Sequence, residues 1–191
     1  MNSNLSTTLS AKDSTPPIGN VLLPAALSLV QSRNIHDYKP ILQNLIDDFG
    51  FTYYHAILIW CKILDDDEDE NKYWQVYLIK WNDETVGICG LYSQYANTTD
   101  ELWLGWFGII PTKRNDKIGQ HALNWMKENA KSIGCKKLMS YVDKHGKPLP
   151  FYYRNGFTNI GTVKEYLSTH TELSIKSFEN ENDHIIECLL S

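Results

Sequence analysis

One short segment of the chain holds the residues best suited to binding an anion. A hydrophobic stretch ends at Ile110. It is followed by Pro111 and by a polar, partly basic loop, and a helical pattern begins at about Gly119. The first amide groups of a helix have no partner within the helix, and the helix dipole places partial positive charge there. A pyrophosphate is a natural occupant of such a turn. The segment therefore predicts an anion site at the start of this helix.

Glu101 is the acidic residue best placed to act as a general base. It opens the hydrophobic stretch 101–110, and strand alternation points its side chain the same way as that of Trp103. A carboxylate partly buried among aromatic side chains suits proton abstraction. The alternative is a carboxylate that faces solvent at the end of a strand. Asp143 and His121 are fallback candidates for the base, but we expect Asp143 to be an ordinary loop acid and His121 a histidine on a helix surface.

The elements around the predicted anion site follow from hydrophobic periodicity. Strand-like stretches precede it at 74–81, 85–95 and 101–110, where they form an antiparallel meander. Apolar residues at helical spacing from Ile118 to Ile133 predict a helix that ends at Gly134, and 138–142 is the next strand. A strand, a helix and a strand in this order indicate a parallel pair joined by a right-handed crossover.

Further elements are expected on both sides of this core. A strand at 26–31 comes first, followed by a helix that Asp37 caps, with Pro40 in its first turn and Gly50 at its end. A second helical stretch carries the apolar residues of 54–61. After the crossover come a short helix at 151–155 and strands at 157–163 and 185–190.

Together with this order of elements, two motifs resemble the GNAT acetyltransferase superfamily. Arg114-x-x-Lys117-x-Gly119 matches the first and last positions of the superfamily's Arg/Gln-x-x-Gly-x-Gly/Ala loop. The second signature is an Asn, an Ala at some spacing and then Phe-Tyr-x-x-x-Gly-Phe. The matching residues here are His145, Pro148 and the run 151–157, which reads Phe-Tyr-Tyr-Arg-Asn-Gly-Phe. The resemblance covers roughly residues 74–161.

The resemblance implies a fold and a domain organisation. The fold would be α/β (α+β), with a central mixed, mostly antiparallel sheet of six to seven strands flanked by about four helices. Residues 1–20, which are rich in Ser, Thr and Asn, are expected to form a disordered arm, and 21–191 a single acetyltransferase domain.

The resemblance also implies acetyl-CoA as co-substrate. Its pantetheine arm would run along the backbone of Phe107, Gly108 and Ile109. Its pyrophosphate would lie on the turn formed by Arg114, Asn115, Asp116, Lys117, Ile118, Gly119 and Gln120. Two residues depart from the pattern: Lys117 stands where the middle glycine is usual, and His145 stands where relatives hold the cofactor with an asparagine. A side chain at position 117 costs stability if the backbone there needs a positive φ.

The catalytic roles implied by the resemblance centre on Tyr152. It matches the tyrosine that can protonate the departing CoA thiolate, and a backbone amide near Ile109 would stabilise the oxyanion. The alternative for Tyr152 is a ring that only packs, with Tyr153 facing solvent. In some relatives the general base is a carboxylate at the position of Ser140. Because this chain has a serine there, that position cannot supply the base.

Composition limits the kinds of partner. The net charge is −5, but much of it comes from the acidic run Asp65 to Glu70, which is either a solvated loop or a funnel for a cationic acceptor. We expect no nucleic-acid partner, because the chain lacks a broad basic surface, and no membrane partner, because it lacks a stretch of about 20 apolar residues. The four cysteines are scattered, which predicts a reduced, cytoplasmic protein without a metal site.

The resemblance therefore implies an N-acetyltransferase that moves an acetyl group from acetyl-CoA to a primary amine of a small molecule or protein. The alternative is a GNAT-fold CoA-binding or regulatory module without catalysis, and a third option is a transferase for longer acyl chains or hydroxyl acceptors. Most of the aromatic residues, Trp103, Trp106 and Phe107 among them, are expected to be core. The resemblance also allows a homodimer that forms through an exposed strand edge.

Overall fold

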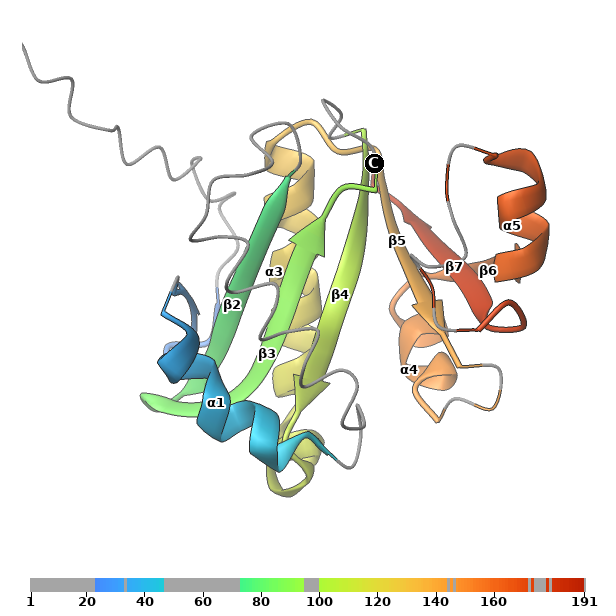
Figure 1. The fold of residues 1–191 in the computed structure, drawn as a ribbon. Helices are drawn as coiled ribbons and strands as arrows, with labels where there is room; N and C mark the ends of the chain where they lie inside the picture. The colour runs from blue at the N-terminus through green and yellow to red at the C-terminus, as the bar shows by residue number, and fades with distance from the viewer. Residues whose placement is uncertain are drawn as a thin grey trace, which may run out of the picture.

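The computed structural model describes residues 23–32, 34–46, 73–94, 100–143, 145, 147–171, 173, 178 and 180–190. Their central feature is a seven-stranded sheet with the strand order β1-β2-β3-β4-β5-β7-β6 (Figure 1). The strands are β1 (Leu27–Gln31), β2 (Trp74–Trp81), β3 (Glu84–Tyr92), β4 (Glu101–Ile109), β5 (Lys137–Val142), β6 (Thr158–Thr162) and β7 (His184–Leu189). The helices are α1 (Ile35–Asn44), η1 (Pro111–Asp116), α3 (Ile118–Ser132), α4 (Leu149–Arg154) and α5 (Val163–Thr169).

The sheet is antiparallel at every junction except the one between β4 and β5, which are parallel. Since α3 connects these two strands, the parallel pair predicted from the sequence is confirmed. The expected α/β (α+β) architecture, with a mixed and mostly antiparallel sheet of six to seven strands, is confirmed as well.

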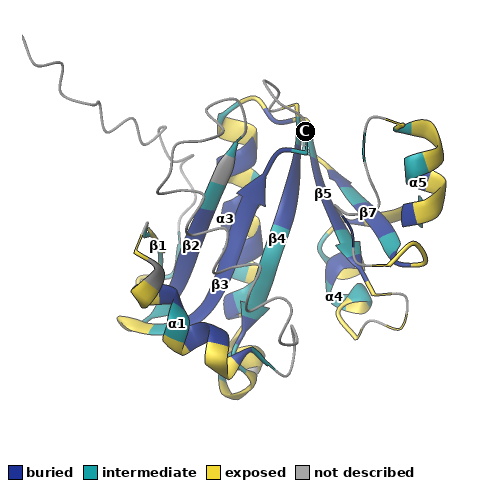
Figure 2. Ribbon diagram, in the orientation of Figure 1, coloured by how far each residue is buried: buried dark blue, intermediate teal, exposed yellow. Residues whose placement is uncertain are grey.

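Two layers of helix cover the sheet. One hydrophobic cluster joins α3 and α4 to one face through residues such as Met126 and Tyr152. The other joins α1 and α5 to the opposite face through residues such as Tyr38 and Tyr166. Figure 2 shows that the central strands are buried along most of their length, whereas α5 is exposed on its outer side. Trp103 is fully buried, as expected of core, while Trp106 and Phe107 are half-buried.

The start of α1 differs from the prediction. The helix begins at Ile35, and its cap is Asn34, whose side-chain Oδ1 accepts a hydrogen bond from the amide of His36 at 3.0 Å. Asp37 does not cap the helix, because its carboxylate accepts the hydroxyl of Ser32 at 2.6 Å. Pro40 consequently lies inside the helix rather than in its first turn.

Several predicted segments lie outside the described residues: the arm 1–20, the end of the first helix at Gly50, the helical stretch 54–61 and the acidic run 65–70. None of the helices in the described part of the chain is both long and apolar enough to cross a membrane.

Candidate active site

The sheet opens between its two parallel strands. β4 and β5 pair only from Glu101 to Trp103 on one strand and from Lys137 to Met139 on the other, and the ribbons separate beyond that point (Figure 1). The register of β4 against β3 shifts between Ile88 and Gly90, where β4 contains one extra residue. This bulge coincides with Trp106, whose φ of 45° is unusual for a residue other than glycine. The bulge bends β4 where it parts from β5.

The backbone of Ile109 faces the edge left open by this separation. The amide of the next residue, Ile110, donates to the carbonyl of Val86 on β3 at 2.9 Å. Because peptide groups of successive strand residues point to opposite sides, the amide and carbonyl of Ile109 point away from β3. Arg114 confirms this direction, since its Nε donates to the Ile109 carbonyl oxygen at 2.8 Å. The Ile109 amide is therefore directed away from β3, toward the open edge of β4.

The predicted anion turn is a short 3₁₀ helix followed directly by α3. Lys117 links the two with φ 57° and ψ 8°, the left-handed conformation that a glycine would adopt without strain. No side chain of the described residues caps α3, and the first backbone bond of the helix runs from the His121 amide to the Lys117 carbonyl at 3.1 Å. The amides of Ile118, Gly119 and Gln120 thus have no partner within the helix and no cap from the side chains that the structure describes, and such donors fit a pyrophosphate.

The two sequence motifs meet around Gly119. A Cβ atom added to this glycine would lie 3.6 Å from Ile109, 3.8 Å from Phe151 and 3.9 Å from Phe107. The rings of Phe107 and Phe151 are stacked, with centroids 5.9 Å apart and planes inclined by 17°. The structure therefore brings the end of β4, the start of α3 and the first residue of the aromatic motif into one contact region.

Tyr152 lies beside the opening between the strands. Its side chain is buried, with rings of Phe151 and Phe157 packed edge-on against it, whereas Tyr153 is 44% exposed. Burial raises the pKa of the Tyr152 phenol above its usual value, and a hydrogen bond with Ser140 opposes that rise. Ser140 Oγ in turn donates to the Leu104 carbonyl on β4 at 3.3 Å, so the Tyr152 phenol stands next to the gap between β4 and β5.

The remaining cofactor candidates differ in how far they are buried. His145 is exposed in the loop between β5 and α4, where its backbone amide donates to Asp143 Oδ1 at 2.7 Å. Asp116 and Gln120 are exposed, and Ile118 is fully buried, so its side chain belongs to the core. Asn115 lies in the 3₁₀ helix η1.

Glu101 lies on the other face of the sheet and at the other end of β4. Its Oε1 accepts the indole N–H of Trp103 at 3.0 Å and the hydroxyl of Tyr166 at 3.0 Å. Its Oε2 faces Lys137 Nζ at 3.3 Å, and the Glu101 side chain is only 13% exposed. The alternation predicted for Glu101 and Trp103 is confirmed. The structure does not bring Glu101 and Tyr152 to the same face of the sheet, because they belong with α5 and α3 respectively.

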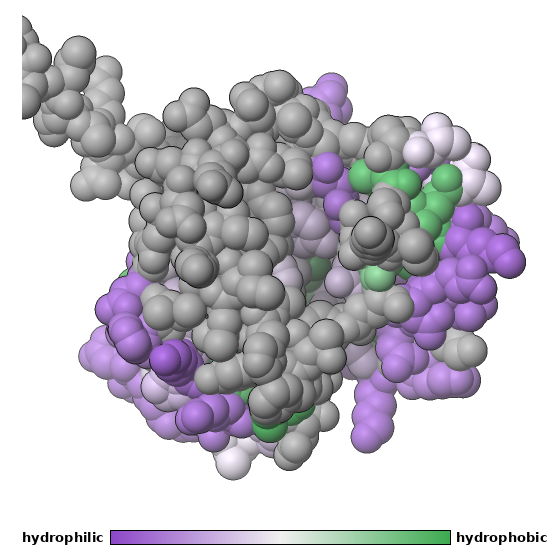
Figure 3. All heavy atoms as spheres, in the orientation of Figure 1, coloured by the Kyte–Doolittle hydropathy of each residue, from purple (hydrophilic) through white to green (hydrophobic). Residues whose placement is uncertain are grey.

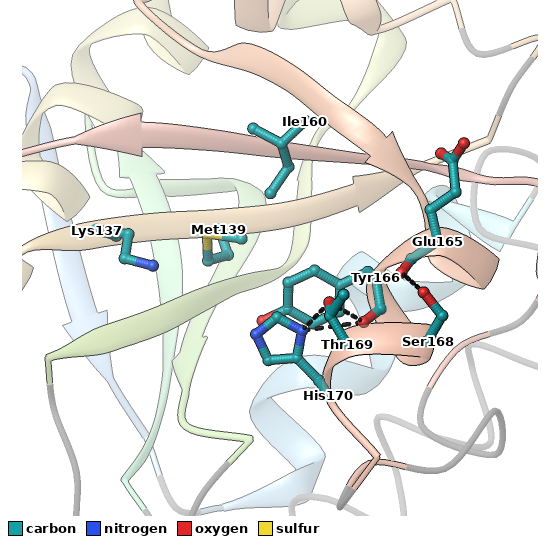
Figure 4. A pocket seen from close by; sticks show the side chains of 8 residues that line it. All are labelled: Lys137, Met139, Ile160, Glu165, Tyr166, Ser168, Thr169 and His170. Carbon is teal, nitrogen blue, oxygen red and sulfur yellow. Dashed lines mark hydrogen bonds between the residues drawn. The ribbon is translucent and has the colours of Figure 1, made fainter.

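A cavity of about 520 Å³ lies between α5 and the strands β5 and β6. Figure 4 shows Lys137 and Met139 of β5 on one side, and Tyr166 and His170 on the other. The rings of Tyr166 and His170 are stacked with centroids 3.9 Å apart. Ile160 of β6 points into the same space, and Ser168 and Thr169 complete the wall.

Sequence reasoning missed α5, and with it Tyr166. A signal was present, since Thr162 and Glu165 form a capping box in which each side chain bonds the other residue's amide. The pairing of Lys137 with Glu101 gave no signal, because it joins residues 36 positions apart. The described residues contain no cluster of three or more His, Cys, Asp or Glu side chains that could hold a metal ion.

A sheet that opens at a bulge and a helix start without a side-chain cap beside it are features that suit a phosphate-bearing ligand. A model of the acetyltransferase (GNAT) family matches residues 38–157, and the chain belongs to this family. The sequence-based resemblance is thereby confirmed. No curated protein sequence matches the chain.

Solved structures share the fold at low sequence identity. An acetyltransferase of the GNAT family from Staphylococcus aureus Mu50 is 18% identical, with a TM-score of 0.61 over 87% of this chain and 100% of that one. The N-acetyltransferase PseH of Campylobacter jejuni in complex with acetyl-CoA is 18% identical, with a TM-score of 0.56 over 86% and 99%. An aminoglycoside 6′-N-acetyltransferase complexed with coenzyme A is 15% identical, with a TM-score of 0.63 over 86% and 97%.

Proposed function

We propose that this protein is an N-acetyltransferase that transfers an acetyl group from acetyl-CoA to a primary amine of a small molecule or protein by direct attack in a ternary complex. The observation that carries the proposal is the alignment of three features along one opening. These are the uncapped start of α3, the Ile109 amide on the open edge of β4, and the Tyr152 phenol beside the gap.

Each of these features has a role in binding or chemistry. The amides of residues 118–120 would hold the pyrophosphate, and the backbone of Phe107 to Ile109 would pair with the pantetheine arm as an added strand does. Acetyl-CoA supplies the activated acetyl thioester. The Ile109 amide would donate to the thioester oxygen, where negative charge develops.

Tyr152 would act as the general acid. A phenol remains protonated at neutral pH, and burial strengthens that preference by raising the pKa of Tyr152. The proton is therefore available when the thiolate leaves. Ser140 has one hydroxyl proton and gives it to the Leu104 carbonyl, so it accepts the hydrogen bond of the Tyr152 hydroxyl. Once the phenolate forms, Ser140 would stabilise it by turning this proton from the carbonyl to the phenolate oxygen.

Glu101 remains the sequence-predicted base, and its contacts add a second role. A base needs a lone pair directed at the amine, yet one oxygen of this carboxylate accepts two hydrogen bonds and the other faces an ammonium group. The same contacts join β4, β5 and α5. Glu101 would thus anchor α5 to the sheet whether or not it also removes a proton.

A second candidate function is a CoA-binding or regulatory module without catalysis. Lys117 favours it, because a lysine in the left-handed conformation strains the turn that holds the cofactor. Tyr152 beside the opening favours the enzyme, since a non-catalytic module has no use for a phenol at that place.

Acetyl-CoA binding measured by calorimetry tests the proposal. We expect micromolar affinity in the native protein and loss of binding in Gly119→Leu, because its side chain would enter the space between Ile109, Phe107 and Phe151. Glu128→Leu, at an exposed position of the same helix, is the control and should bind normally. A screen of primary amines for acetylation then separates the two functions. Failure of the native protein to bind acetyl-CoA would contradict both.

A further inference from the structure

The amide of Ile109 belongs to the peptide group that joins Gly108 to Ile109. The N–H of Ile109 and the C=O of Gly108 lie in this one planar group and point in opposite directions. Since the Ile109 amide points to the open edge of β4, the Gly108 carbonyl points toward β3. Whatever fixes the Gly108 carbonyl therefore also fixes the amide that we expect at the thioester.

Gly87 is the β3 residue that faces this carbonyl. It is buried, and its partner in the register of the two strands is Ile109. A Cβ atom added to Gly87 would overlap the Gly108 carbonyl oxygen, well inside van der Waals contact. The same atom would lie 2.7 Å from Ile109 Cδ1 and 3.3 Å from Ile79 Cδ1. The two backbones approach each other here so closely that a residue with a side chain does not fit.

The backbone conformation at position 87 does not require a glycine. Gly134, Gly156 and Gly161 have positive φ values, and Gly87 does not belong to this group. A glycine inside a strand weakens the strand, because it loses more conformational freedom on folding than other residues do. The remaining reason for a glycine at this buried position is the space that the Gly108 carbonyl occupies.

The contact with the carbonyl differs from the two contacts with side chains. Each Cδ1 atom is the end of a side chain and can move away by rotation. The carbonyl oxygen can move only if its peptide plane turns or if β4 shifts. The next peptide group is held in place, since the Ile110 amide donates to the Val86 carbonyl at 2.9 Å. A Cβ atom at position 87 would therefore turn the peptide between Gly108 and Ile109, and its N–H with it.

We propose that Gly87 is a positioning residue for acetyl transfer: by leaving room for the Gly108 carbonyl, it directs the Ile109 N–H at the thioester oxygen. This role rests on the proposed function. When the amine nitrogen bonds to the acetyl carbon, an electron pair of the C=O bond moves to the oxygen. An N–H already in place stabilises that charge without reorganisation. A misplacement of about 1 Å in such a site can cost about a hundredfold in rate.

A matched set of variants separates the carbonyl from the side chains. Ile79→Val and Ile109→Val each remove a Cδ1 atom. When Gly87→Ala is added to them, only the contact with the Gly108 carbonyl remains of the three. The reference for this triple variant is the double variant Ile79→Val/Ile109→Val, which keeps Gly87. Because the two valines make room, the triple variant also serves if Gly87→Ala alone does not fold.

Infrared spectroscopy of bound acetyl-CoA, isotopically labelled at the acetyl carbonyl, reports on the amide directly. A hydrogen bond to the thioester oxygen lowers the stretching frequency of this carbonyl, so the native protein and the double variant should shift it to lower frequency than in free acetyl-CoA. The triple variant should lose most of this shift. Its kcat with the best amine of the screen should be at least about tenfold below that of the double variant. The Kd for CoA, which lacks the acetyl carbonyl, should stay close to that of the double variant.

Two controls exclude a general effect of substitution. Ile186→Val removes one methyl group from a fully buried residue of β7, away from the opening, and should keep both the infrared shift and kcat. In the view of Figure 3 the described surface on the side of α5 is mainly hydrophilic, with a small hydrophobic area within it. Lys164→Ala, at an exposed position of α5, should likewise change neither quantity.

The possible results distinguish the role of Gly87 from the proposed function. An unchanged infrared shift or an unchanged kcat in the triple variant would overturn the role of Gly87 and leave the proposed function intact. A loss of affinity for CoA as large as the loss in kcat would also overturn it, because the whole cofactor site would then be distorted. A native protein that binds no acetyl-CoA, or that acetylates no primary amine, would contradict the proposed function and this role together.

Discussion

Arg114 holds the end of β4 rather than only lining the predicted cofactor turn. Its Nε donates to the Ile109 carbonyl at 2.8 Å, across the boundary between the strand and the 3₁₀ helix. Because the amide and carbonyl of Ile109 point to the same side, this bond also fixes the direction of the Ile109 amide. One side chain thereby couples the pyrophosphate turn to the amide that we expect at the thioester.

Arg114→Lys should weaken acetyl-CoA binding about tenfold, because an ammonium cannot reproduce the fixed geometry of the guanidinium N–H groups. Isothermal titration calorimetry measures this directly. Arg154→Lys, at the exposed end of α4, is the matched control and should bind like the native protein. Equal affinities in the two variants would remove Arg114 from the site.

Lys117→Gly should make the protein more stable than Lys117→Ala by about 1 kcal/mol. The φ of 57° at this position disfavours any residue with a Cβ atom, and both variants remove the charge equally. Chemical denaturation gives the difference in the free energy of unfolding. If alanine proves as stable as glycine, the turn is not held in the left-handed conformation in solution.

Tyr152→Phe should lower kcat about a hundredfold, which is the usual contribution of a general acid. KM for acetyl-CoA should change little, because the buried ring still packs between Phe151 and Phe157. Tyr153→Phe is the neighbouring control, at 44% exposure, and should keep full activity. Steady-state kinetics that show equal kcat for the two variants would reduce Tyr152 to a packing residue.

Tyr166→Phe and Glu101→Gln separate anchoring from base catalysis. Tyr166→Phe removes one hydrogen bond to the Glu101 carboxylate, so we expect about 1 kcal/mol of lost stability and little change in kcat. Glu101→Gln should destabilise the protein further, because Lys137 loses its partner. Thermal unfolding measures both effects. A hundredfold lower kcat in Glu101→Gln at unchanged stability would instead support the base.

Alkaline pH should destabilise the protein through its buried tyrosines. Burial raises the pKa of Tyr77 to about 12, and it raises the pKa of Tyr152 as well. The unfolded chain therefore ionises first, near the usual pKa of about 10. This contribution to stability is complete below pH about 10 and is lost as the pH rises toward about 12. Tyrosinate absorbance followed during alkaline unfolding should report the two events together; a stability independent of pH above 10 would contradict it.

Much of the fold could be predicted because its elements have regular hydrophobic periods. All seven strands and α3 were found near their observed positions, and the parallel pair followed from the order strand, helix, strand. The start of α1 was placed too late, since Asn34 and Asp37 can both cap a helix and only the contact of Asp37 with Ser32 decides between them. α5 has seven residues, too few for a hydrophobic period to stand out.

The cofactor turn could be predicted because its motif is local, but the shape of the opening could not. The bulge depends on a positive φ at Trp106, a conformation that tryptophan rarely adopts and that propensity therefore argues against. The environment of Glu101 depends on Tyr166, which is 65 positions away. Local patterns carry no information about such a pair, so Glu101 could be assigned to a face of the sheet but not to its partners.

The strand order has a consequence for how the protein is made. β7 lies between β5 and β6, and it pairs with both of them, whereas β5 shares only a three-residue register with β4. During synthesis β5, α4, β6 and α5 therefore emerge before the strand that joins them. β6 can join β5 in the sheet only once β7, residues 184–189, has left the ribosome and can pair with both strands. The cavity wall formed by β5, β6 and α5 is completed only after translation has passed this strand.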